Sequence, residues 1–112
     1  MLYQIKNVQS RAANGENQRG EKGGGGKARG GRKGCPSISP LNAGKTYTLL
    51  DAVGSGVVRH IWLTFPPGDP IILRNLILRM YWDGQTQPSV EVPICDFFGL
   101  PHGAARYLQS AY

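Results

Sequence analysis

The sequence has no long apolar run, and its first residues are not an evident secretory signal. None of its apolar stretches approaches the roughly 20 residues that a membrane-spanning helix needs. The first six residues, MLYQIK, do not form an apolar core followed by a small-residue cleavage site. We therefore expect no membrane partner. The compartment stays open, with the cytoplasm as the default expectation.

Cysteine and histidine are also scarce, with two of each in 112 residues. Small secreted domains that depend on disulfides carry more cysteines than Cys35 and Cys95. A zinc site would need four ligands from four separate places, without any CxxC spacing. We predict two ordinary thiols, buried or half-buried, with no metal and no cofactor. Gly44-Lys45-Thr46 is not a phosphate-binding loop, because position 39 is a serine and a strand-like segment follows.

The net charge of +6 lies entirely in the first third of the chain. Residues 1–34 hold eight basic and two acidic side chains, whereas residues 35–112 hold five of each. Nine of the sixteen glycines also lie in residues 1–34, and residues 14–34 contain one alanine and no larger apolar side chain. Such a segment cannot offset its ordering entropy by burying apolar surface. We predict a Gly-rich basic arm over 1–34, ordered only where a partner subunit, a ligand or the domain body holds it.

The arm contains one Arg-Gly-Gly at residues 29–31 and an Arg-Gly at 19–20. Tracts that bind single-stranded RNA repeat this unit many times and usually interleave aromatic residues. Nucleic-acid binding through the arm is therefore the least favoured of the functions considered.

Residues 35–112 read as an all-β domain with Gly- and Pro-rich turns. Strand-forming residues dominate 46–52, 57–65, 71–82 and 89–94. Asp83-Gly84 between the last two runs is a hairpin signal. Segment 71–82 also contains good helix formers, but its neighbours favour a strand. Four or five strands leave edges open, so we expect a larger parent protein or an oligomer to supply the rest.

Several side chains in this domain have the chemistry of a carbohydrate site. Glu91 and Asp96 are carboxylates five residues apart, and glycosidases use such pairs. Ordinary positions in a turn, at a loop cap or on a solvent face explain the acidic residues more simply. His102 lies between proline and glycine on a loop, where functional residues concentrate.

Three blocks together carry a family resemblance. They are residues 16–17 (EN), 20–23 (GEKG) and 31–34 (GRKG); residues 58–64 (VRHIWLT); and residues 76–84 (LILRMYWDG), 88–93 (PSVEVP), 96–99 (DFFG) and 102–103 (HG). The chain thereby resembles the N-terminal part of the domain of unknown function 2961, glycoside hydrolase family 172, over about residues 10–112. Cys95 stands where the family usually has glycine, and Pro101 where a glycine often precedes the histidine.

The resemblance implies a jelly-roll-type β-sandwich, the first half of a double jelly roll, in a homo-oligomer of three or six subunits. It implies hydrolysis of furanosides, either α-D-arabinofuranosides or difructose dianhydrides. The family retains configuration with two glutamates. The resemblance places both beyond the part that this chain matches, so no catalytic residue is assigned here and the chain is expected to be catalytically incomplete alone.

The resemblance and the loop positions together suggest substrate-binding residues. On the arm these are Glu21, Lys22 and Arg32. In the domain, Trp82, Asp83 and the loop from Asp96 to His102 are expected to gather where strands end. The alternative function is a non-catalytic structural module that assembles through its open edges.

Overall fold

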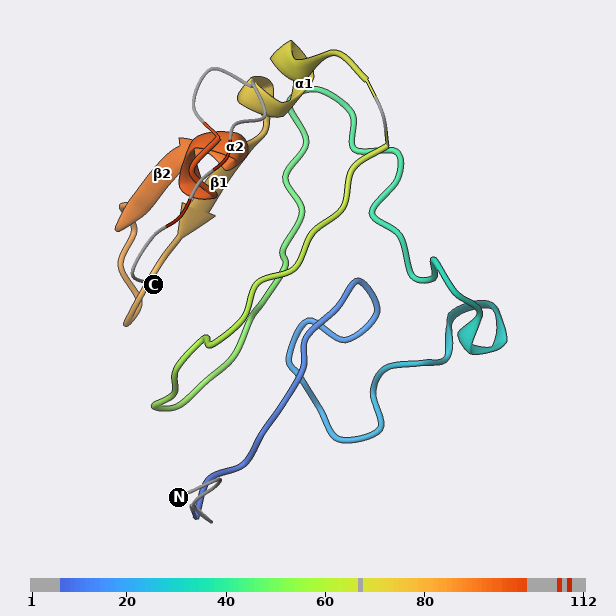
Figure 1. The fold of residues 1–112 in the computed structure, drawn as a ribbon. Coiled ribbons are helices and arrows are strands. Elements are labelled where there is room, and N and C mark those ends of the chain that lie inside the picture. Colours follow the sequence, from blue (N-terminus) through green and yellow to red (C-terminus); the bar gives the residue numbers. More distant parts are fainter. Residues whose placement is uncertain (1–6, 67, 101–106, 108, 110–112) are drawn as a thin grey trace. The chain divides into compact units, whose positions relative to one another are not determined.

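The computed structural model describes residues 7–66, 68–100, 107 and 109 (Figure 1). The chain divides into two compact units, Met1–Arg59 and His60–Tyr112. The regular elements, in chain order, are the 3-10 turn η1 (Ala28–Gly31), helix α1 (Pro70–Asn75), strand β1 (Ile77–Met80), strand β2 (Val90–Pro93) and helix α2 (Ile94–Phe97).

The second unit is built on an antiparallel hairpin of β1 and β2, as the sequence predicts. Ile77 pairs with Pro93 at one end and Met80 with Val90 at the other. In the connection, Asp83 and Gly84 both have positive φ, 50° and 72°, and the Gln85 amide donates to the Trp82 carbonyl at 3.0 Å. Two consecutive positive φ values define the type I′ turn that Asp-Gly favours.

The prediction of one strand over 71–82 is wrong in its first half. Residues Pro70–Asn75 are helical because the Asp69 carboxylate caps the first turn, accepting the Ile71 amide at 2.9 Å. The backbone returns to an extended conformation at Leu76, with φ −85° and ψ 113°. The segment therefore uses both the helix-forming and the strand-forming tendencies of its residues.

The core of the second unit is small. Leu78, Ile94 and Cys95 are its buried apolar side chains. The Ile94 amide donates to the Leu76 carbonyl at 2.8 Å, which extends the ladder of the hairpin into the start of α2. Cys95 is a free, buried thiol and Cys35 a free, half-buried one, which confirms the prediction of two ordinary thiols.

Two further predicted strands do not form. In the described residues, 46–52 and 57–65 have no strand, and the only backbone hydrogen bond from either joins the Asp51 amide to the Gln18 carbonyl. A strand needs a hydrogen-bonding partner as well as the right composition. The described residues thus form mostly irregular chain, with one two-stranded antiparallel sheet and short helices among them. Within the described part, no helix has the length and apolar character to cross a bilayer.

Candidate functional site

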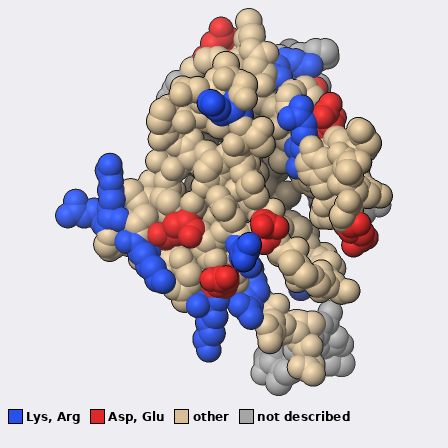
Figure 2. Space-filling view, turned by 180° about the vertical axis from the view of Figure 1, so that it is seen from behind, with Lys and Arg blue, Asp and Glu red and all other residues tan. Residues whose placement is uncertain are grey.

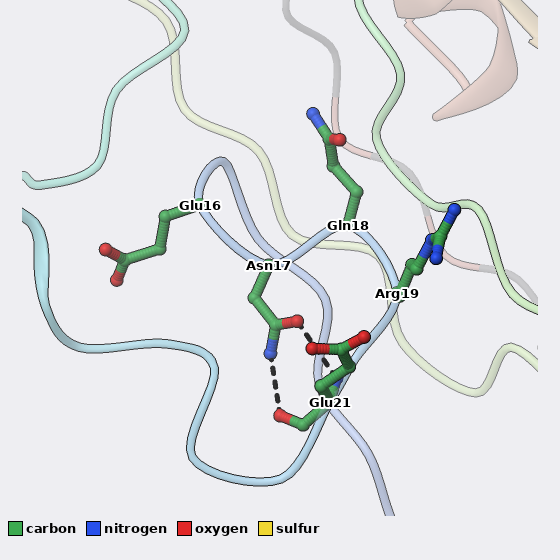
Figure 3. Close-up of a pocket in the computed structure, with 5 residues that line it drawn as sticks. All are labelled: Glu16, Asn17, Gln18, Arg19 and Glu21. Atoms are coloured by element: carbon green, nitrogen blue, oxygen red, sulfur yellow. Dashed lines mark hydrogen bonds between the residues drawn. The ribbon is translucent and has the colours of Figure 1, made fainter.

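The Gly-rich segment of the first unit is folded by its own polar side chains. Asn17 is 8% exposed, and its side chain forms two bonds with the main chain of Glu21: Nδ2 donates to the carbonyl and Oδ1 accepts the amide, each at 2.9 Å (Figure 3). Asn14 and Asn17 also exchange main-chain bonds of 3.2 and 3.0 Å. These bonds within the segment add to the predicted ways of ordering it, which were a partner subunit, a ligand or the body of the domain.

Glu16 connects the start of this segment to η1. Its carboxylate accepts the amides of Lys27 at 3.0 Å and Ala28 at 2.6 Å. Desolvation raises the pKa of Glu16, but hydrogen bonds from the amides of Lys27, Ala28 and Gly26 outweigh it and lower the pKa below its ordinary value. The ionised carboxylate therefore holds the two parts of the loop together.

Glycine is required where these bonds bring the chain close to itself. A β-carbon at Gly24 would lie 2.6 Å from Cγ of Asn17, and one at Gly25 would lie 2.8 Å from Nδ2 of Asn14. Neither position has a positive φ, so the requirement comes from space alone. The glycines at these two positions admit the asparagine side chains that organise the loop.

Contacts with later residues of the same unit hold the loop from outside. The Tyr47 hydroxyl donates to the Gly15 carbonyl at 2.6 Å, and the Asp51 amide donates to the Gln18 carbonyl at 2.9 Å. Nε of Arg19 lies 3.8 Å from Oδ2 of Asp51 in an exposed pair. Hydrogen bonds thus replace the apolar burial that the segment cannot supply.

Two open depressions lie on this loop. The larger, of about 630 Å³, is lined by the predicted site residues Glu21 and Lys22 together with the main chain of several glycines. The smaller, of about 210 Å³, is lined by residues 16–19 and Glu21. The Glu16 and Glu21 carboxylates point in different directions (Figure 3). The structure brings Glu21 and Lys22 to one depression, whereas Arg32 lines neither.

The predicted residues of the second unit that the structure describes lie on different elements. Trp82 and Asp83 lie in the connection beyond Met80, whereas Asp96 lies in α2, beyond the opposite end of the hairpin. Four paired residues at about 3.4 Å each separate these ends by about 10 Å. These positions give no support to the expected clustering of Trp82, Asp83 and Asp96, which stays a prediction. His102 lies outside the described residues.

Two of the acidic residues considered as carbohydrate ligands are engaged in ion pairs. Both Asp96 carboxylate oxygens accept from NH1 of Arg74, at 2.7 and 3.0 Å, and this pair joins α1 to α2. Glu91 accepts from Nε of Arg79 at 2.6 Å across the hairpin, and that bond raises the pKa of Arg79. Asp96 therefore has a structural partner in addition to its predicted binding role.

Sequence reasoning missed the organising residues Asn14, Glu16 and Asn17 as site builders. The signal was present as two asparagines and a glutamate, spaced within four residues, at the start of a glycine run. Asparagine and aspartate side chains commonly bond nearby main-chain groups in this way. In the described residues, no group of three potential metal ligands comes together.

A comparison with known protein families shows to which family the chain is related. Residues 37–110 match the GH172 domain-like family. The chain belongs to this family. No curated protein and no solved structure matches the chain. The predicted resemblance to glycoside hydrolase family 172 is thereby confirmed.

The GH172 domain-like region contains every regular element of the second unit. The β1–β2 hairpin, both helices and the Arg74–Asp96 pair lie within 37–110. The loop built by Glu16 and Asn17 lies before the matched region. The chain therefore combines a family domain with a polar loop that has its own internal organisation.

Proposed function

We propose that the chain is the N-terminal portion of a furanoside-acting glycoside hydrolase, with residues 1–34 as an arm and residues 35–112 as part of a jelly roll. Its membership of the GH172 domain-like family carries this proposal. The substrate is an α-D-arabinofuranoside or a difructose dianhydride. Turnover requires two glutamates outside the part of the family that this chain matches.

The exposed surface supports assembly with further protein. Large apolar side chains contribute to this surface, including Val53 at 102% and Trp62 at 71% exposure. A second copy or another segment of the same subunit would cover them. This observation also supports the alternative function, a non-catalytic assembly module.

The depression lined by Glu21 and Lys22 is where we place the sugar. Its carboxylate and ammonium groups have no ion-pair partner within 4.0 Å among the described residues. Sugar hydroxyls both donate and accept, so adjacent acceptor and donor groups suit them. Glycine main chain beside these groups lets a ligand approach the backbone closely.

Titration of the 15N-labelled chain with α-1,5-linked D-arabinofuranotriose tests this proposal. Shifts should be confined to amides of residues 20–26, with xylotriose, a pyranoside of similar size, as the matched control. Glu21→Gln and Lys22→Ala should each weaken the response. Equal response to both sugars, or none to either, would refute furanoside recognition at this loop. Hydrolysis of 4-nitrophenyl α-D-arabinofuranoside by the chain alone would contradict the placement of the catalytic glutamates.

A further inference from the structure

The first unit carries a dense group of cations around η1, which we call the basic turn (residues 27–33). Lys27, Arg29, Arg32 and Lys33 are all exposed. None of them has a carboxylate within 4.0 Å among the described residues, where the ion pairs involve Arg19, Arg74 and Arg79 instead. Lysine and arginine side chains project from the molecular surface (Figure 2). Four exposed cations in seven residues, with the Glu16 carboxylate at the Lys27 and Ala28 amides as the acidic group beside them, leave a net positive turn that attracts a polyanion.

The backbone beneath these cations has a defined shape. The Glu16 carboxylate holds the Lys27 and Ala28 amides, and the Gly30 amide donates to the Lys27 carbonyl at 3.1 Å. Gly31 passes so close to Gly26 that a β-carbon on Gly31 would lie 2.9 Å from the Gly26 carbonyl oxygen. The cations therefore stand on a closed loop, and a ligand bound there would not have to order a flexible tail.

We propose that the basic turn binds an acidic polysaccharide through the carboxylates of uronate residues. The choice of a carbohydrate rests on the proposed function, and the choice of an anionic one rests on the charge of the turn. Arg29 and Arg32 each present a planar guanidinium that can bond both oxygens of a carboxylate. The turn would thus hold an acidic chain while the furanoside is recognised elsewhere.

The same charge attracts nucleic acid, but the structure favours it less. Residues 7–34 contain no aromatic side chain on which a base could stack. Within the described part of the first unit, the only helical element is the four-residue η1 and no strand forms. Nothing there has the size of the helix or β-ribbon that reads a major groove. Contacts with phosphate alone would remain.

Binding of a fluorescent hexagalacturonate to the intact chain, followed by anisotropy at 20, 50 and 150 mM NaCl, tests the proposal. The double variant Arg32→Gln/Lys33→Gln should lose about tenfold in affinity at 50 mM salt. Its matched control is Lys45→Gln/Arg59→Gln, which removes one exposed lysine and one exposed arginine outside the turn. The control should lose less than about twofold. Equal losses in both variants, or no binding at 20 mM salt, would overturn the proposal.

A second variant separates a shaped turn from a merely basic one. Glu16→Gln raises the net charge of the arm by one but removes the carboxylate that holds Lys27 and Ala28. A shaped site predicts weaker hexagalacturonate binding by Glu16→Gln, whereas tighter binding would show that charge alone acts and would overturn the proposal. A single-stranded DNA hexamer that binds as tightly as hexagalacturonate would likewise overturn it. Neutral arabinofuranotriose reports on the proposed function independently, so either idea can fail without the other.

Discussion

Replacing Gly24 by alanine should destabilise the loop of the arm through a steric clash with the Asn17 side chain. The new β-carbon would lie 2.6 Å from Cγ, 2.7 Å from Nδ2 and 2.8 Å from Oδ1 of Asn17. Because the amide of Asn17 is held by two bonds of 2.9 Å to Glu21, it cannot move without breaking them. Two neutral hydrogen bonds at about 1 kcal/mol each give a cost of about 2 kcal/mol in local stability.

Amide hydrogen exchange measures this cost directly. The Gly20 amide, which donates to the Asn17 carbonyl at 3.2 Å, reports on opening of the loop. Its protection should fall about 30-fold in Gly24→Ala, because 1.4 kcal/mol corresponds to a factor of ten. Gly56→Ala is the matched control. A β-carbon there meets nothing within 4 Å and φ is not positive, so protection of Gly20 should not change.

The double variant Asn17→Ala/Gly24→Ala distinguishes the collision from a general effect of alanine. Asn17→Ala alone should cost about 2 kcal/mol, since it removes the same two bonds. The three atoms nearest to the new β-carbon all belong to the Asn17 amide. With that amide removed, the double variant should be no less protected than Asn17→Ala alone. Additive losses from the two substitutions would refute the reasoning.

Three other predictions concern separate parts of the molecule. Hydrogen bonding lowers the pKa of Glu16, so the stability that the Glu16 carboxylate gives the loop is complete above the ordinary carboxyl pKa and is lost as the pH falls through the pKa of the folded state. Amide exchange at residues 27 and 28 should show this pH dependence in the parent chain. Glu16→Gln should remove it. Leu78→Ala should destabilise the hairpin by about 2 kcal/mol or more, since Leu78 is 7% exposed, and unchanged urea denaturation would contradict its core position. Arg74→Ala should cost about 1 kcal/mol through loss of the half-buried pair with Asp96, with a smaller effect in high salt; a salt-independent loss would argue against that attribution.

The predicted hairpin was accessible from sequence because its signals are local. Asp83-Gly84 supplies the two positive φ values of the turn. The alternation of Leu78 and Met80 with exposed neighbours shows which face of β1 is the more buried. The helix at Pro70–Asn75 was not recognised because the composition of this segment resembles that of a strand. The hydrogen bond that starts the helix, from the Ile71 amide to the Asp69 carboxylate, does not show in that composition. The prediction of strands at 46–52 and 57–65 was wrong for a different reason. The composition of both segments fits a strand, but neither forms a ladder of hydrogen bonds with a partner strand in the described residues.

The structure of the arm shows contacts that its composition alone does not reveal. Low apolar content predicts disorder because little surface can be buried to offset the lost entropy. Here the Glu16 carboxylate bonds amides 11 and 12 residues away, and Asn17 bonds both main-chain groups of one residue. Glycine contributes by leaving room for these side chains, as at Gly24. The segment is thus ordered by polar contacts whose partners no compositional average reveals, and the carboxylate that closes the loop also gives the neighbouring cations a defined backbone.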